Sequence, residues 1–137
     1  MTIKIEKSKD KTQVIILSID GNLDASNFQD VIETAKQASA NGAQYLLIDM
    51  SGVKFMSSSG IVALHSVALL MDGAEPPDLE NGWEAFHALD RNRKNGLQPR
   101  VKLLNPQPKV QRSLEITGMT EFFEIHSDLA IAIASFS

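Results

Sequence analysis

The chain has 137 residues, of which 43% are hydrophobic and 22% charged, and its formal net charge at pH 7 is −4. This length suits one domain with its own buried core, and the composition excludes the disordered and fibrous classes. Because the sequence has no cysteine and no basic excess, thiolate chemistry is excluded and nucleic acid is not an expected partner. We expect a cytoplasmic protein with no membrane partner, since the longest apolar stretch, residues 61–71, is too short to span a bilayer.

The first half of the chain predicts a hairpin, a helix and a buried strand. Residues 2–7 alternate apolar and polar side chains, and residues 13–19 are largely apolar and β-branched, as in two paired strands. The turn residues Asp20-Gly21-Asn22 follow, and apolar side chains at helical spacing predict a helix from about residue 25 to 40. Residues 45–48 then form a short apolar run, which is typical of a strand buried on both faces.

The second half predicts a further alternation of helices and strands. Residues 58–71 are apolar around most of the helical circumference, which indicates a central helix packed on a sheet. A strand is expected at residues 101–104, followed by a helix with Asn105-Pro106 as its N-cap and first helical position. A short strand at residues 122–126 and a small helix capped by Ser127-Asp128 complete the chain.

This order of elements predicts a single α/β domain over residues 1–137. Strands separated by helices pair in parallel, and the first hairpin adds an antiparallel strand, so we expect a mixed β-sheet of about five strands with about four α-helices. The connection at residues 72–99 is far longer than usual and is interpreted as an insertion. Within it, Trp83, Phe86 and Leu89 form an apolar stripe that either packs on the domain itself or serves partner binding or self-association as a homo-oligomer.

The residues offer little for catalysis, and we expect a protein that is not an enzyme and that needs no cofactor and no metal. A serine nucleophile needs a base within hydrogen-bond reach, but His65 lies about two helical turns from Ser58. The histidines also lack the spacing of a zinc-binding pair. They are His65, His87 and His126.

Asp49 offers an alternative function as the phospho-acceptor of a receiver-type domain. It is expected at the end of the central strand that contains residues 45–48, where a receiver domain carries its phospho-acceptor. That function also requires an acidic pair to hold Mg²⁺ at the end of the first strand of the sheet. Only Asp20 and Asp24 come near such a position, so the sequence favours this alternative least.

Three consecutive serines, Ser57, Ser58 and Ser59, stand where the central helix is expected to begin. One serine suffices to cap a helix by accepting a hydrogen bond from a backbone N–H of the first turn. Three serines leave hydroxyl groups for solvent, and Gly60 gives the first turn no side chain. Because the free N–H groups and the helix dipole tolerate an anion, a phosphate here would change the surface charge and leave the fold intact. The pattern predicts a helix end that can act as a binding switch.

Three motifs resemble one known family. The sequence GNLD at residues 21–24 resembles the G-x-L-D turn of STAS domains, the sulfate transporter and anti-sigma factor antagonist family. Residues 46–64, LLIDMSGVKFMSSSGIVAL, are similar to the signature of that family, a strand followed by D-x-S-G-V-x-F-x-D-S-S-G and a helix. Residues 101–125 resemble its later strand, its N-P-x-V-x-x-x-L helix and its final strand. The resemblance covers nearly the whole chain except residues 72–99.

The resemblance implies an anti-sigma factor antagonist in a partner-switching pathway of transcription regulation. In that family an anti-sigma factor serine kinase phosphorylates the first serine of D-S-S-G, a phosphatase reverses the reaction, and the phosphorylated form releases the kinase. By position, the phospho-acceptor falls on Ser58, with Ser57 and Ser59 as alternatives. The partner-binding surface falls on Asp24, the three serines and Gly60, and Ser57 stands where the family has an acid.

The resemblance also implies an alternative function. STAS domains occur in stress-sensing assemblies, in lipid-transport complexes and attached to anion transporters, where they bind partners without the switch. This protein would then be a scaffold or assembly subunit. In that case the serines only cap the helix, and the stripe of Trp83, Phe86 and Leu89 is the working surface.

Overall fold

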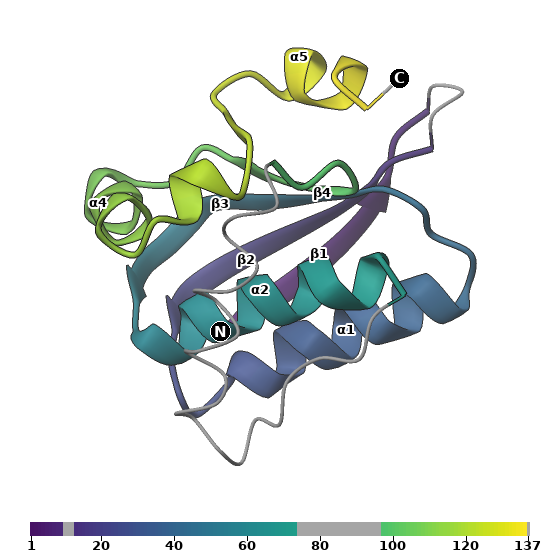
Figure 1. The fold of residues 1–137 in the computed structure, drawn as a ribbon. Helices are drawn as coiled ribbons and strands as arrows, with labels where there is room; N and C mark the ends of the chain where they lie inside the picture. The colour runs from purple at the N-terminus through teal and green to yellow at the C-terminus, as the bar shows by residue number, and fades with distance from the viewer. Residues whose placement is uncertain (10–12, 74–96, 137) are drawn as a thin grey trace.

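The computed structural model describes residues 1–9, 13–73 and 97–136. Their backbone forms one five-stranded sheet with helices on both faces (Figure 1). The strands lie in the order β1-β2-β3-β4-β5, with β1 antiparallel to β2 and the other neighbours parallel. This mixed sheet and the four α-helices of the described ranges confirm the predicted fold class. Within the same ranges, no helix has both the length and the apolar character needed to cross a membrane.

The elements alternate as the sequence predicted. The strands are β1 (Thr2–Lys7), β2 (Ile15–Leu23), β3 (Leu46–Met56), β4 (Val101–Leu104) and β5 (Ile125–His126). The helices are α1 (Phe28–Ala40), α2 (Ser58–Met71), α4 (Pro108–Ile116), the 3-10 turn η2 (Met119–Glu121) and α5 (Leu129–Ala134). The bounds of α2 and β4 are those predicted from the sequence.

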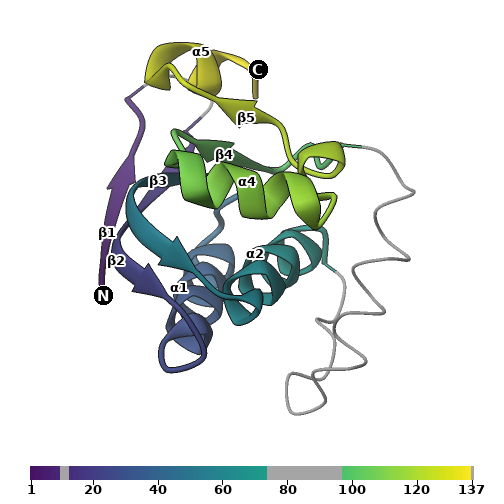
Figure 2. The same ribbon diagram turned by 90° about the vertical axis from the view of Figure 1, so that its left-hand side faces the viewer.

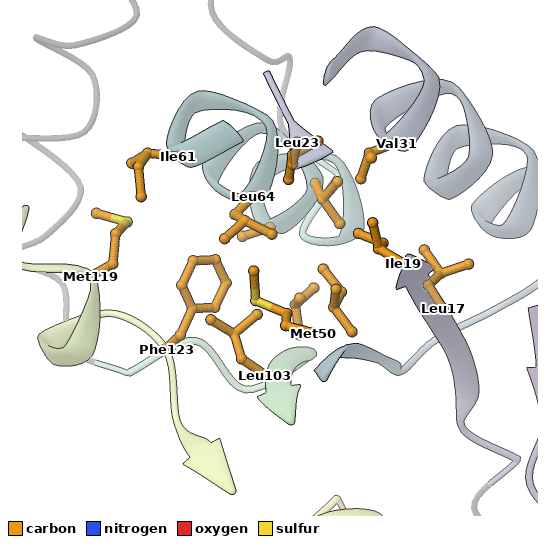
Figure 3. Packing of buried hydrophobic residues seen from close by; sticks show 14 of the residues in the cluster. Leu17, Ile19, Leu23, Val31, Met50, Ile61, Leu64, Leu103, Met119 and Phe123 are labelled. Atoms are coloured by element: carbon orange, nitrogen blue, oxygen red, sulfur yellow. The ribbon is translucent and has the colours of Figure 1, made fainter. Parts of the chain in front are cut away.

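The main core lies between the sheet and the helices α1 and α2 (Figures 1 and 3). Leu17, Ile19 and Met50 of the sheet are buried in the same cluster as Val31 of α1 and Leu64 of α2. α2 is buried around most of its circumference, with α1 along one side. This position explains why the sequence of α2 has almost no polar face.

The C-terminal helix α5 covers part of the opposite face of the sheet, where Ala132 and Phe136 belong to a second, smaller cluster. Lys102 of β4 is also buried there. Its Nζ donates to the carbonyl and the hydroxyl of Ser135, each at 3.0 Å, and lies 3.0 Å from a carboxylate oxygen of Glu124. The same ammonium is 4.7 Å from the centre of the Phe136 ring. One buried charge therefore ties β4 to the end of the chain.

β2 and β3 extend further than the sequence predicted. The expected turn at Asp20-Gly21-Asn22 is wrong because these residues continue β2, and β3 continues past Asp49 to Met56. The two strands stay paired until Leu23 lies opposite Met56, with two register shifts along the way. Gly21 accommodates this irregularity because its φ of 112° suits glycine rather than other residues. Residues typical of turns therefore lie inside long strands.

Two later boundaries also differ from the prediction. α4 begins with Pro108 at its first turn rather than with Pro106, because Asn105 adopts a left-handed conformation with φ of 51° and delays the helix. The last strand contains only Ile125–His126. Residues 122–123, which were predicted as its beginning, are phenylalanines buried in the main core after η2.

The two ends of the 72–99 insertion are held together. Nε2 of Gln98 donates to Oδ2 of Asp72 at 2.7 Å, and Nε of Arg100 lies 4.0 Å from Oδ1 of the same carboxylate. The backbone N–H of Gln98 also donates to the carbonyl of Phe122 at 2.7 Å, which fixes the point where the chain returns to the domain. The predicted stripe at Trp83, Phe86 and Leu89 lies outside the described residues.

Candidate functional site

Two of the sequence motifs meet where β2 and β3 end, at the left of Figure 1. The paired strands stop at Leu23 and Met56, and the next residues, Asp24 and Ser57, each begin a turn into a helix. The backbone N–H of Ser57 donates to the carbonyl of Leu23 at 2.9 Å, which fixes the two turns against each other. Because neighbouring parallel strands bring their carboxyl ends to one edge of the sheet, residues far apart in sequence form a single surface here.

The three serines on this surface differ in exposure. Ser58 is exposed, Ser59 is half-buried, and the Oγ atom of Ser57 is buried without a hydrogen-bond partner in the described part of the chain. Ser57 occupies the N-cap position of α2, but its side chain makes no capping hydrogen bond. Its carbonyl instead accepts from the N–H groups of Gly60 at 3.0 Å and Ile61 at 3.3 Å. The side-chain cap expected from one of the serines is therefore not made by Ser57, the N-cap residue, and Ser58 presents the most accessible hydroxyl.

Gly60 is needed for close packing rather than for surface contact. It is buried, and a Cβ atom at this position would collide with Cγ of Met56. The same Cβ would lie 3.1 Å from Cγ of Leu23 and 3.2 Å from the Leu23 carbonyl oxygen. The absent side chain allows the first turn of α2 to rest on the ends of both strands. Gly60 therefore shapes the surface that Ser58 occupies.

Asp24 organises the neighbouring turn. Its Oδ1 accepts from the hydroxyl of Ser26 at 2.6 Å and from the N–H of Ser26 at 2.9 Å. Asn27 adds two bonds, accepting from the Asp24 N–H at 3.0 Å and donating to the Asn22 carbonyl at 2.7 Å. The Ser26 hydroxyl, and then its N–H, lower the pKa of Asp24, so the carboxylate is charged at neutral pH. This turn also makes α1 begin at Phe28 rather than at residue 25.

The helix end at Ser58 is electrostatically positive. The N–H of Gly60 bonds to the Ser57 carbonyl, whereas the N–H groups of Ser58 and Ser59 come before any acceptor within the helix, and no acidic residue stands in the first turn of α2. The last residues of β3 before it include Lys54 and Phe55, which are both exposed, and 54% of the Phe55 surface is open to solvent. Between Phe55 and Ser58 the surface thus combines an aromatic side chain, a hydroxyl and the positive end of α2.

Asp49 does not lie where the receiver-type alternative requires it. It is inside β3 rather than at its end, and its Oδ1 accepts from the N–H of Ser51 at 3.0 Å. Together with Asp20 it lines an open hollow of about 450 Å³ that also includes Lys4. Asp24 is instead part of the turn after β2. Across residues 1–9, 13–73 and 97–136, no group of three or more acidic or histidine side chains is placed to hold a metal ion.

His65 is a buried imidazole in the middle of α2. The side chain has no exposed surface, and neither ring nitrogen has a hydrogen-bond partner in the described ranges. Its ring centre lies 5.4 Å from that of Phe122. Burial lowers the pKa of His65 to about 4, so the ring is neutral at neutral pH. The sequence indicated neither a catalytic nor a zinc-binding role for His65. His87 lies outside the described residues.

Comparison with known proteins gives a family and a set of similar folds. The family model of the STAS domain matches residues 6–72, and no curated protein matches the sequence. An anti-sigma factor antagonist from Mycobacterium paratuberculosis has a TM-score of 0.65 and 16% identity, with 98% of this chain and 94% of that chain covered. A protein of Thermotoga maritima, described as a candidate anti-sigma factor antagonist, has a TM-score of 0.69 and 14% identity, with 96% of this chain and 93% of that chain covered.

A third similar protein has been solved in two states. The anti-sigma factor antagonist SpoIIAA in its unphosphorylated form has a TM-score of 0.64 and 15% identity, with 95% of this chain and 93% of that chain covered. The phosphorylated form of Bacillus SpoIIAA has a TM-score of 0.54 and 15% identity, with 98% of this chain and 100% of that chain covered. At these identities the likeness shows a common fold, and the matched residues 6–72 contain both turns of the site.

Proposed function

Because this chain belongs to the STAS domain family, whose model its residues 6–72 match, we propose that it is an anti-sigma factor antagonist controlled by phosphorylation of Ser58. The unphosphorylated protein binds an anti-sigma factor serine kinase, and the phosphorylated protein releases it until a phosphatase removes the phosphate. The observation that carries this proposal is the exposed Ser58 hydroxyl at the amino end of α2, beside two serines that are half-buried or turned inward.

The local electrostatics support a phosphate at this position. A phosphoserine carries between about one and a half and two negative charges, and the free N–H groups of the first turn of a helix favour an anion. Asp24 is already charged, and its turn is bonded to the residue before Ser58 through the Leu23 carbonyl. Phosphorylation would therefore convert a surface with one carboxylate into a strongly anionic one. A partner seated on Phe55 and Ser58 would lose contact area and meet uncompensated charge.

The backbone around Ser58 also suits a modification that leaves the fold unchanged. The first turn of α2 is held by the Ser57 carbonyl and by the close packing of Gly60, neither of which involves the Ser58 side chain. SpoIIAA, which has a similar fold, has been solved in both unphosphorylated and phosphorylated forms. We therefore expect phosphorylation to act on binding and to change the stability of this domain little.

The proposal is tested by binding of the kinase to three variants. Ser58→Ala should bind an anti-sigma factor kinase of the same organism and stay bound when ATP is added, because the acceptor is missing. Ser58→Asp should bind at least about tenfold more weakly, as expected from a loss of about 1.4 kcal/mol. Ser59→Ala removes a neighbouring hydroxyl and should still be released by ATP. Equal affinities of Ser58→Ala and Ser58→Asp, measured by calorimetry, would contradict the proposal.

A further inference from the structure

The outer edge of β1 is a second surface with a defined chemistry. β1 is the first strand of the sheet and pairs only with β2 among the described strands, so its other side faces outward (Figure 2). All but one of its six residues are exposed. An unpaired strand edge presents backbone N–H and C=O groups that can pair with another strand. We propose that β1 is a self-association strand, through which two copies of this chain pair antiparallel and join their sheets.

The charges along β1 define one register for such a pair. Two identical antiparallel strands are related by a twofold axis, and an axis at Ile5 places Lys4 opposite Glu6 of the partner subunit and Glu6 opposite Lys4 of the partner subunit. Both side chains are exposed and lie on one face of the sheet, because alternate residues share a face. Within one copy they are already 2.9 Å apart. The pairing would therefore form a compact group of four alternating charges.

Neighbouring registers are unfavourable. An axis at Lys4 would place this residue opposite Lys4 of the partner subunit. An axis at Glu6 would place the Glu6 carboxylate opposite Glu6 of the partner subunit. Like charges directly opposite each other destabilise a strand pair, whereas opposite charges stabilise it. Charged edge residues usually prevent association, but directly opposed residues repel only where their charges have the same sign. The alternation of Lys4 and Glu6 leaves the register centred on Ile5 free of repulsion.

The apolar surface of the edge points to the same centre. Ile5 has 56% of its surface exposed and lies on the face that carries α1, opposite to the face of Lys4 and Glu6. It lines a hollow of about 270 Å³ between the edge of the sheet and the end of α1, together with Ala38 and Ala43. With the axis at Ile5, the two isoleucines lie side by side over this hollow. Association would then remove an exposed isoleucine from water in each copy.

Charge reversal gives a direct test of the proposed pair. Sedimentation equilibrium of the full chain should show a monomer–dimer equilibrium in the micromolar to millimolar range, since a single strand pair is a small interface. Lys4→Glu and Glu6→Lys should each raise the dissociation constant by about tenfold or more, because each creates like-charge pairs. The double variant Lys4→Glu/Glu6→Lys restores opposite charges in the same register and should dimerise as well as the unmodified chain.

A second measurement on the unmodified protein does not depend on the variants. The amide hydrogens of β1 that point outward should exchange more slowly as the protein concentration rises, and those of α5 should not change. A monomer at all concentrations, failure of the double variant to recover, or protection that is independent of concentration would each overturn the proposal. None of these outcomes depends on Ser58, so these experiments test the self-association strand independently of the proposed phosphorylation of Ser58.

Discussion

Acidification should destabilise this domain through His65. The ring has a pKa of about 4 in the folded protein, against an ordinary value of 6.5 when the chain is unfolded. Between these two values the unfolded chain binds the proton and the folded protein does not. The free energy of unfolding should therefore fall as the pH is lowered from about 6.5 to about 4, and this contribution should level off below that range.

The size of the effect follows from the shift. One pKa unit corresponds to about 1.36 kcal/mol, so a shift from 6.5 to about 4 corresponds to about 3 kcal/mol when the pH is well below both values. At pH 5 the loss relative to neutral pH is about 2 kcal/mol. A small domain has a total stability of about 5 to 15 kcal/mol, so this single buried ring should account for a large part of acid unfolding.

Urea unfolding measured by circular dichroism across this pH range gives the assay. His65→Leu removes the titrating ring and should lose most of the dependence between pH 6.5 and pH 4. Ser66→Ala is the matched control, because its hydroxyl is also buried in α2 without a partner in the described ranges but does not titrate. Its pH dependence should follow that of the unmodified protein. An NMR titration that places the pKa of folded His65 near 6.5, or equal pH dependence of His65→Leu and the parent, would refute the reasoning.

Three further predictions concern packing and the insertion. Gly60→Ala should lower the free energy of unfolding by about 1 to 3 kcal/mol in urea, because its Cβ has no room beside Met56; unchanged stability would contradict the packing described here. Lys102→Ala should lower the free energy of unfolding by about 2 to 3 kcal/mol and increase amide exchange in α5. Increased exchange confined to β4 would contradict the role of Lys102 in holding the residues after α5 against β4. Replacing residues 75–96 by a short Gly-Ser linker should leave the fold intact by circular dichroism, because Asp72 holds both ends together. Loss of partner binding in that deletion, with Ser58 phosphorylation retained, would favour the scaffold function.

The sequence predicts the order and kind of the elements well, because their periodicity is local. The apolar run of α2 and the strand at residues 101–104 could be read directly, and Asp128 caps α5 as expected by accepting from the Ile131 N–H at 3.0 Å. The ends of β2 and β3 could not be predicted. Gly21 and Gly52 look like turn residues in isolation, and only pairing between the two strands keeps them in the sheet.

The sequence places the candidate site at the start of α2, but its geometry could not be predicted. The serine run marked the start of α2, yet the exposure of each hydroxyl depends on neighbours from another strand. Ser57 faces inward and Ser58 outward because the helix rests on Leu23, to whose carbonyl the Ser57 N–H is bonded. The turn at Asp24 had a readable signal, since an aspartate two residues before a serine favours an Asx-turn. The burial of Lys102 had no signal in the sequence, because its partners come from distant parts of the chain.

Mapping of the phosphate after reaction with an anti-sigma factor kinase and ATP tests the central claim most directly. Tandem mass spectrometry of the modified chain should place one phosphate on Ser58, and the modified protein should no longer co-elute with the kinase. Phosphate on another residue, or a phosphorylated Ser58 that still binds the kinase, would contradict the account.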